Sequence, residues 1–251
     1  MKEYDTFPAN ICIRLNRNCN LSCAFCLASN KSEELSTKQL KTAIEYLKFR
    51  GIKKACLAGG EPTIRSDFIE IVEFCIAIGL KTVIYSNLFD IDNVFSDLVQ
   101  YPISVTTSIH GNQSIHDLLT QPGAYEATYR NINKLISNNI DVSIHTVLMR
   151  KNYHCAEEIV QNAIAAGVKK LSFQTLIPRE KGAKLFEETE DQEDIIERLH
   201  ALYPLKETYA NKIKIKFINL YKKNYYVLET DGSLYLQTSN GLNDELIQRV
   251  I

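Results

Sequence analysis

The chain has 251 residues, 45% of them hydrophobic, and its 29 basic and 30 acidic residues leave a formal net charge of −1. A chain of this length can bury a substantial core, and α/β barrels of this size commonly form one domain. The balanced charges argue against nucleic acid or a membrane surface as partner, and no apolar run approaches the roughly 18 residues that a membrane span requires.

Short β-branched and apolar runs alternate with amphipathic stretches along the chain, a pattern that predicts βα units around a parallel sheet. The predicted strands cover residues 11–15, 54–57, 82–85, 103–108, 142–148 and 170–173. The predicted helices between them cover residues 37–49, 67–78, 92–99, 124–137 and 155–166. Six strands with intervening helices make an α/β fold, a partial, open (β/α)6 barrel.

The carboxyl-terminal part of the chain follows a different pattern. Its predicted elements are a helix over residues 187–200, a strand over 213–219 and a hairpin with strands at 225–229 and 234–237, joined by a Thr-Asp-Gly turn. We therefore expect the barrel domain to span residues 1–185 and a small C-terminal α+β extension to span residues 186–251.

Lysines alternate with aromatic residues in the stretch NKIKIKFINLYKKNYY, residues 211–226. Such interleaving occurs in proteins that bind single-stranded nucleic acid. A strand with solvated lysines on one face explains the pattern more simply. We therefore expect no nucleic-acid partner and keep transfer RNA only as the minor alternative.

Three of the seven cysteines, Cys19, Cys23 and Cys26, fall within the eight residues CNLSCAFC. Thiolates are the usual protein ligands of zinc and of iron–sulfur clusters. A structural zinc site uses four protein ligands, and no fourth Cys or His lies near this segment. Three cysteines suit a [4Fe-4S] cluster that leaves one iron open for a substrate or cofactor.

The remaining cysteines, Cys12, Cys56, Cys75 and Cys155, fall in predicted strands and helices, where buried, inert thiols are the default. The amino terminus lacks the basic-then-apolar order of a signal peptide. Thiols in a chain without a secretion signal favour a reducing cytoplasm over a disulfide framework. The expected localisation is therefore cytoplasmic.

A second motif, GGEP, stands at Gly59, Gly60, Glu61 and Pro62, after the second predicted strand. With CxxxCxxC ahead of it in this order, the chain resembles the radical S-adenosylmethionine (SAM) superfamily over roughly residues 8–185. That resemblance implies the same partial barrel that the strand pattern predicts.

The run SIHGNQSIHDLLTQPGAY, residues 108–125, is similar to one branch of this superfamily. The branch contains molybdenum-cofactor cyclases, pyrroloquinoline-quinone maturases and peptide-modifying enzymes. Its members often carry extra clusters bound by cysteines in the carboxyl-terminal region. Here the last cysteine is Cys155, so we expect no auxiliary cluster.

The resemblance implies that Cys19, Cys23 and Cys26 bind three irons of the cluster and that the amino and carboxylate groups of SAM bind the fourth. Reductive cleavage of SAM would then give methionine and a 5′-deoxyadenosyl radical. Iron–sulfur potentials range from about −700 to +450 mV, and this reaction needs the low end. The implied partner is an electron donor of the flavodoxin or ferredoxin type.

The resemblance also implies roles for residues outside the cysteine triad. In the family, Gly59 and Gly60 allow close backbone approach to the methionine moiety, Glu61 takes its ammonium group and Pro62 fixes the turn. The other residues that the resemblance places around the cluster and SAM are Phe25, Ser86, Asn87, Ser108 and Val147. Each also has an ordinary structural explanation, which is packing for Phe25 and Val147, strand capping for the three polar residues and a simple turn for GGEP.

The positions of these motifs along the chain give an independent test. Barrel enzymes build their active sites from the loops at the carboxyl ends of the strands. The cysteine segment, GGEP, Ser86-Asn87, the run from Ser108 to Gly111, and Gln174 follow the first, second, third, fourth and sixth predicted strands. All of these motifs are therefore expected on one rim of the barrel.

The leading hypothesis is a radical SAM enzyme that abstracts hydrogen from a peptide or a cofactor precursor. A second hypothesis keeps this chemistry and makes the substrate a nucleotide, sugar or other small metabolite. The lack of an auxiliary cluster and of a peptide-recognition domain before Cys19 favours the second somewhat. A third, non-catalytic hypothesis is a zinc- or cluster-binding regulatory module. No residue is assigned as a catalytic acid or base, and His110 is expected to make structural hydrogen bonds.

Overall fold

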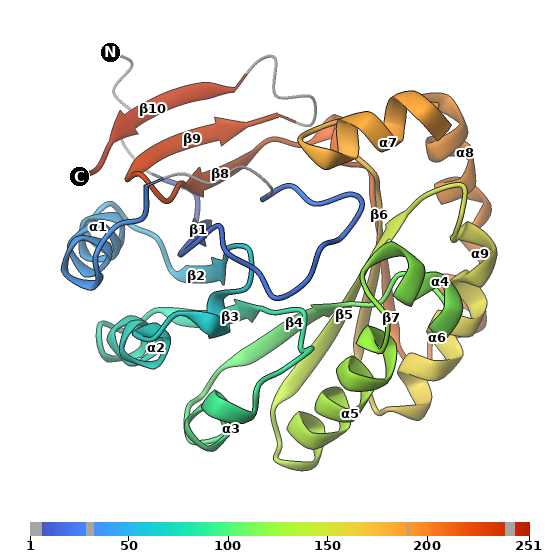
Figure 1. Ribbon diagram of the computed structural model, residues 1–251, viewed down its shortest axis with the longest axis horizontal. Coiled ribbons are helices and arrows are strands. Elements are labelled where there is room, and N and C mark those ends of the chain that lie inside the picture. Colours follow the sequence, from blue (N-terminus) through green and yellow to red (C-terminus); the bar gives the residue numbers. More distant parts are fainter. Residues whose placement is uncertain (1–6, 29–32, 190, 239–243) are drawn as a thin grey trace.

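The computed structural model describes residues 7–28, 33–189, 191–238 and 244–251. Its strands form one curved sheet in the order β10-β9-β8-β1-β2-β3-β4-β5-β6-β7 (Figure 1). The strands are β1 Asn10–Arg14, β2 Lys54–Ala58, β3 Lys81–Tyr85, β4 Ser104–Ser108, β5 Asp141–Leu148, β6 Lys170–Thr175, β7 Lys214–Ile218, β8 Tyr225–Leu228, β9 Ser233–Gln237 and β10 Glu245–Arg249. The sheet does not close, so the predicted α/β fold with a partial, open barrel is confirmed.

Helices cover the outer face of the sheet (Figure 1). The α-helices are α1 Thr37–Phe49, α2 Phe68–Ala77, α3 Asp92–Leu98, α4 Gln113–Leu119, α5 Ala124–Ser137, α6 Ala156–Ala165, α7 Lys181–Thr189, α8 Gln192–Ala201 and α9 Pro204–Thr208. Three short 3-10 helices are η1 Pro62–Ile64, η2 Tyr153–Cys155 and η3 Leu220–Lys222. Ser36 caps α1 in a reciprocal capping box with Gln39, as an N-cap serine commonly does.

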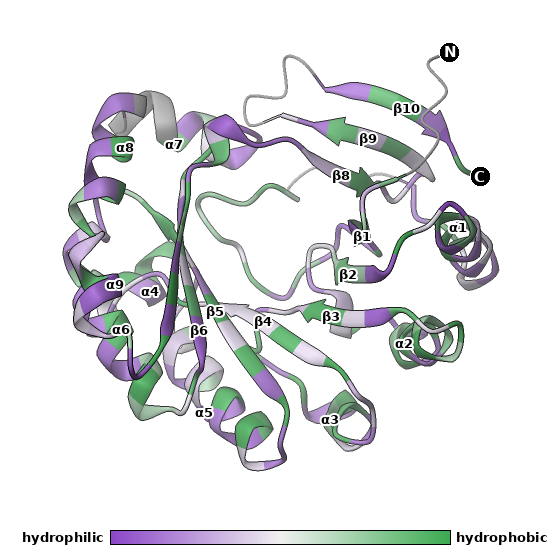
Figure 2. Ribbon diagram, turned by 180° about the vertical axis from the view of Figure 1, so that it is seen from behind, coloured by the Kyte–Doolittle hydropathy of each residue, from purple (hydrophilic) through white to green (hydrophobic). Residues whose placement is uncertain are grey.

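The alternation of side chains along the strands separates an apolar outer layer from a more polar interior. Ile11 and Ile13 of β1 are buried in the core that β1 shares with the helices, whereas Cys12 and Arg14 point to the concave side. The register pairs Arg14 of β1 with Ala58 of β2. In Figure 2 the same alternation is visible along β6, where hydrophilic and hydrophobic residues take turns. The concave face therefore carries polar side chains that can take part in binding or catalysis.

The six predicted barrel strands are confirmed within a few residues of their ends, and the predicted strand at 213–219 is β7, which extends the parallel sheet beyond β6. The predicted helix over residues 187–200 is wrong in its bounds, since α7 already begins at Lys181 and α8 follows from Gln192. Helix α4 and strand β10 were not expected from the pattern. Each is short and has few buried positions, which leaves little periodicity to detect.

The carboxyl-terminal strands lie on both edges of the barrel. Strand β7 pairs in parallel with β6, and β8 pairs in parallel with β1, while β9 and β10 continue as an antiparallel meander. The predicted boundary at residue 185 falls inside α7, and the division into two domains stays a prediction. Among the described residues, no helix has the length and hydropathy to cross a bilayer.

Candidate active site

A cavity of about 330 Å³ opens at the carboxyl ends of the strands β1 to β6. It brings together the three cysteines and most of the other residues predicted for the site. Those that line it are Cys19, Cys23, Cys26, Phe25, Gly59, Gly60, Ser86, Asn87, Ser108 and Val147. Segments far apart in the sequence thus meet on one rim, as the strand-end rule predicts. The segment after β1 runs inside the curve of the sheet (Figure 1).

Hydrogen-bond donors point at two of the cysteine sulfurs. The backbone N–H of Leu21 donates to the Sγ of Cys19 at 3.3 Å, and that of Ala28 donates to the Sγ of Cys26 at 3.3 Å. The side-chain amide of Asn87 also reaches the Sγ of Cys19, at 3.7 Å. Such contacts stabilise thiolates and influence the reduction potential of a cluster that they ligate.

Cys23 and Cys26 are half-buried, whereas Cys19 is exposed. Burial raises the pKa of Cys23 to about 12 and also raises the pKa of Cys19. Without a positively charged ligand these groups are therefore neutral thiols, and binding of a metal group must displace their protons. Three thiols on one short loop, with N–H donors directed at sulfur, form a donor set that fits an iron–sulfur cluster.

Among the described residues, no three His, Cys, Asp or Glu side chains gather closely enough to bind a single metal ion. A four-iron cluster makes a different demand, since each thiolate binds a separate iron. The three cysteines would hold three of the irons, and the fourth would have no thiolate ligand from this segment.

Backbone contacts fix the cysteine segment in place. The N–H of Ala24 donates to the carbonyl oxygen of Leu119 at 3.0 Å. At the start of α7, the N–H of Lys181 donates to the carbonyl oxygen of Cys26 at 3.3 Å, and the Lys181 ammonium group donates to Ser22 Oγ at 3.2 Å. The loop is thereby tied to two separate elements of the barrel.

The glycines of GGEP pack directly against the residues that precede Cys19. The N–H of Gly60 donates to the carbonyl oxygen of Asn16 at 3.0 Å, and that of Glu61 donates to the carbonyl oxygen of Asn18 at 2.8 Å. A Cβ at position 60 would lie 2.2 Å from the carbonyl oxygen of Asn18. Glycine is thus required here because two backbones approach closely, whatever SAM demands in addition.

Glu61 and Pro62 do not line the cavity, in contrast to the two glycines. The buried Glu61 carboxylate accepts from the N–H and the hydroxyl of Thr63, at 3.2 and 2.7 Å, and from the N–H of Asn87 at 2.7 Å. Pro62 is the first residue of η1, where its missing N–H costs nothing. Here the Glu61 carboxylate ties the β2 loop to the β3 loop. Its family role toward the SAM ammonium group therefore stays a prediction.

Replacing Glu61 by glutamine is expected to lower the free energy of unfolding of the cluster-free protein by about 1–3 kcal/mol. The new amide would set an NH₂ donor against the N–H of Asn87 or the donors of Thr63, so one buried donor loses its acceptor. Chemical denaturation measures the change. Glu70→Gln is the matched control, because Glu70 is exposed and forms a solvent-exposed ion pair with Lys41 rather than contacts with buried donors, so this substitution should change the free energy of unfolding by no more than about 0.5 kcal/mol. If the two substitutions lowered the free energy of unfolding equally, the Glu61 carboxylate would not be holding the β2 and β3 loops together.

Ser86 and Asn87 lie at the cavity wall and also shape the loop after β3. Ser86 Oγ accepts from the N–H of Leu88 at 3.0 Å, and Asn87 Oδ1 accepts from the N–H of Phe89 at 2.8 Å. The Asn87 amide group donates to Asn20 Oδ1 at 2.8 Å, which links this loop to the cysteine segment. Both residues therefore combine the capping role with a position beside the proposed ligands.

His110 has the structural role expected for it. Its Nδ1 accepts from the N–H of Val147 at 3.3 Å, and its own backbone N–H donates to Nδ1 of His116 at 3.1 Å. The two rings stack with centroids 5.7 Å apart, and Phe25 meets His110 edge-on at 4.5 Å. Burial holds the pKa of His110 well below its usual value, so the imidazole is neutral.

A third histidine, the half-buried His145, gives a pH dependence of stability. Burial, aided by Lys216, lowers the pKa of His145 from 6.5 to about 4. The unfolded chain takes up a proton below pH 6.5 whereas the folded chain does not until about pH 4. Stability should therefore fall as the pH drops through this range. At its low end, His145 should have lowered the free energy of unfolding by about 3 kcal/mol.

Urea unfolding at a series of pH values measures this effect. The variant His145→Phe keeps a ring at this position and should show a shallower loss of stability between pH 6.5 and 4 than wild type. His154→Gln serves as control, because His154 is exposed. A wild-type slope retained in His145→Phe would contradict the assignment.

The cavity also contains residues that the sequence did not assign to the site. They include Cys12, Arg14, Tyr85, Thr106, His116, Thr120, Thr175, Leu176, Ile177 and Leu220. Cys12, expected to be a buried thiol, is half-buried and lines the cavity. Arg14 could have been found, since it is the one charged residue of its strand and alternates with buried isoleucines. Its ion-pair partner, Glu229, lies 215 residues further along the chain, and no sequence pattern indicates that the two residues meet.

Comparison with known proteins identifies one family. Residues 13–163 match the family model described as the Radical SAM superfamily. An uncharacterised protein of Methanocaldococcus jannaschii is 28% identical over 96% of this chain and 92% of its own length. The sporulation killing factor maturation protein SkfB of Bacillus subtilis is 30% identical over 64% of this chain but only 40% of its own length.

Solved structures show the same fold at low sequence identity. SuiB of Streptococcus suis bound to S-adenosylmethionine has a TM-score of 0.78 and 16% identity, over 98% of this chain and 64% of that protein. The protein anSMEcpe, with bound AdoMet and the Kp18Cys peptide, has a TM-score of 0.78 and 17% identity, over 96% of this chain and 77% of that one. At such identities the likeness concerns the fold alone.

Proposed function

The chain belongs to the radical SAM superfamily of enzymes, and on this premise we propose that it cleaves SAM reductively at a [4Fe-4S] cluster held by Cys19, Cys23 and Cys26. The observation that carries the proposal is that the three thiols open into the same cavity as the strand-end residues of β2 to β6. When bound, the cluster supplies the electron that breaks the sulfur–carbon bond of SAM and yields a 5′-deoxyadenosyl radical.

The protein's own residues would position SAM and exclude water. Gly59 and Gly60 present backbone to the cavity, and Ser86 and Asn87 offer polar groups at the end of β3. Val147 and Phe25 supply apolar walls, with Phe25 held against the buried His110 ring. Ser108 lies between these groups on β4. These walls would limit the access of water to SAM when it is bound.

For the substrate we propose a peptide or a cofactor precursor, from which the radical abstracts hydrogen. The support is that SkfB is named a maturation protein and that SuiB has been solved with its precursor peptide SuiA. A relative named probable GTP 3′,8-cyclase, 29% identical over 86% of this chain, supports a nucleotide as the alternative. The reductant would be a flavodoxin or ferredoxin in the reducing cytoplasm that the cysteine usage favours.

Anaerobic reconstitution with iron and sulfide, followed by addition of dithionite and SAM, tests the reaction. The expected result is 5′-deoxyadenosine, detected by mass spectrometry, from protein that contains about four irons and four sulfides per chain. Zinc without iron or sulfide would instead support the regulatory module. Iron-loaded protein that forms no 5′-deoxyadenosine would exclude the proposed activity. Faster product formation with GTP than with candidate peptides would favour the nucleotide alternative.

A further inference from the structure

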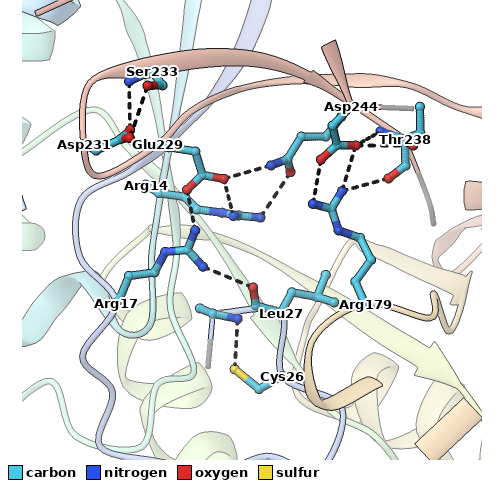
Figure 3. Close-up of polar contacts among 12 residues, drawn as sticks. Arg14, Arg17, Cys26, Leu27, Arg179, Glu229, Asp231, Ser233, Thr238 and Asp244 are labelled. Atoms are coloured by element: carbon cyan, nitrogen blue, oxygen red, sulfur yellow. Dashed lines mark hydrogen bonds and ion pairs between the residues drawn. The ribbon is translucent and has the colours of Figure 1, made fainter. Parts of the chain in front are cut away.

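The carboxyl-terminal strands deliver an acidic side chain to the base of the cysteine segment. Strand β8 pairs with β1 through Cys12 with Val227 and Ile13 with Leu228, which sets the next residue, Glu229, beside Arg14. The Glu229 carboxylate accepts from the guanidinium groups of both Arg14 and Arg17 (Figure 3). The three side chains are only 12%, 13% and 9% exposed for Arg14, Arg17 and Glu229.

Arg17 connects this ion pair to the far end of the cysteine segment. Its Nη2 donates to Glu229 Oε2 at 2.6 Å, and its Nη1 donates to the carbonyl oxygen of Leu27 at 3.3 Å. The three cysteines all lie between residues 17 and 27 in the sequence. The guanidinium group of Arg17 therefore closes the loop that contains them, and Glu229 holds this group in place (Figure 3).

Arg14 faces the cavity itself. It is the one lining residue with a formal charge near neutral pH, within the described part of the chain. Gln237 of β9 completes its surroundings, because the Gln237 amide donates to Glu229 Oε1 at 2.8 Å and its carbonyl oxygen accepts from Arg14 Nη2 at 3.4 Å.

The buried group of Arg14, Arg17 and Glu229 carries two positive charges and one negative charge. The nearby carboxylates of Glu34 and Asp67 pair with Arg65, and Glu34 Oε1 also accepts from the backbone N–H of Arg17 at 3.0 Å. With Arg65 included, the charges of these side chains balance, but Glu34 is exposed, so solvent screens its charge more than that of the buried Glu229. An excess charge in a buried position is unfavourable unless an opposite charge lies close by. A four-iron cluster has two positive charges on its resting core and gains three negative charges from three thiolates, so its net charge is negative by one.

We propose that Arg14, Arg17 and Glu229 form the counter-charge of the cluster, and that Glu229 is a positioning residue that sets both the closure of the cysteine loop and the cluster's reduction potential. The inference rests on the proposed function, because it requires that the cluster is present. It assigns a role to strands β8 and β9, whose sequence showed no functional motif. Net charge near a cluster is one of the determinants of its potential.

The proposal predicts that the midpoint potential of the cluster shifts in opposite directions when a negative and when a positive charge is removed. Reduction adds an electron, so positive surroundings favour the reduced cluster. Glu229→Gln removes a negative charge and should shift the midpoint potential upward. Arg14→Gln removes a positive charge and should shift it downward, whereas Arg14→Lys conserves the charge and should leave it near the wild-type value.

Asp231→Asn is the matched control for the Glu229 substitution. Asp231 lies two residues further along, its side chain is 36% exposed, and its ion-pair partner is the exposed Arg249 at 3.8 Å. Its carboxylate otherwise accepts from Ser233 within the same turn. Loss of this charge should leave the potential unchanged, because solvent screens it.

The test is an anaerobic redox titration of the reconstituted protein, followed by electron paramagnetic resonance (EPR), with iron and sulfide counted for each variant. Opposite shifts in Glu229→Gln and Arg14→Gln, with no shift in Asp231→Asn, would support the proposal. Shifts of the same sign, or none, in cluster-loaded variants would overturn it. If Glu229→Gln does not fold, the two Arg14 variants decide: a lower potential in Arg14→Gln than in Arg14→Lys would support the proposal, and equal potentials would overturn it. Wild-type protein without a cluster would instead refute the proposed function.

Discussion

Replacing Cys23 by alanine is expected to abolish formation of 5′-deoxyadenosine and to lower the iron content of reconstituted protein well below the wild-type value. Cys23 is the middle ligand of the triad and lines the cavity. Two remaining thiolates leave a second iron without a protein ligand, and no other cysteine of the described residues lines the cavity except Cys12. Product analysis after addition of SAM and dithionite measures the first effect, and iron and sulfide assays measure the second.

Cys155→Ala is the control for this experiment. Cys155 is buried at the start of α6 and does not line the cavity, so its loss should reduce stability slightly and leave cluster assembly intact. A Cys23→Ala protein that retains a full complement of iron and cleaves SAM would remove Cys23 from the ligand set. The proposed triad would then be wrong.

Replacing Gly60 by alanine is expected to cost about 3 kcal/mol or more of stability and to impair cluster binding at the same time. The added Cβ would lie 2.2 Å from the carbonyl oxygen and 2.6 Å from the carbonyl carbon of Asn18. Both atoms belong to backbone, which cannot turn aside as a flexible side chain can. Because Asn18 directly precedes Cys19, relief of the overlap must displace the first cluster ligand.

Gly51→Ala separates this steric effect from ordinary backbone strain. Gly51 has φ +101, which disfavours alanine, but nothing lies within 4 Å of the position that an added Cβ would take. Its substitution should therefore cost about 1–2 kcal/mol and leave iron content unchanged. Thermal unfolding and iron assays on both variants make the comparison. Normal iron content in Gly60→Ala would show that the GGEP loop does not support the cysteine segment.

The barrel was predictable because its signal is local and repeated. Each of the strands β1 to β6 is a short apolar run, and each is followed by a helix whose buried positions recur with helical period. Because these strands are parallel, their carboxyl ends all lie on one rim of the barrel. The cysteine segment, GGEP and Ser86-Asn87 could thus be placed together from the sequence alone.

The contacts of the carboxyl-terminal region were not predictable in the same way. Nothing in residues 225–237 indicates that β8 returns to pair with β1, because parallel pairing between distant strands depends on the whole sheet. The Arg14–Glu229 ion pair follows from that pairing alone. Similarly, the GGEP motif predicted Glu61 beside SAM, but its carboxylate partners, Thr63 and Asn87, depend on how two strand-end loops meet.

The central claim is that the three cysteines hold a cluster with one iron open to SAM. EPR spectra of the anaerobically reconstituted, dithionite-reduced wild-type protein, recorded with and without SAM, test this most directly. We expect the signal of a reduced four-iron cluster whose g-values change when SAM is added, because SAM binds the open iron. A cluster signal that saturating SAM leaves unchanged would contradict the open coordination site.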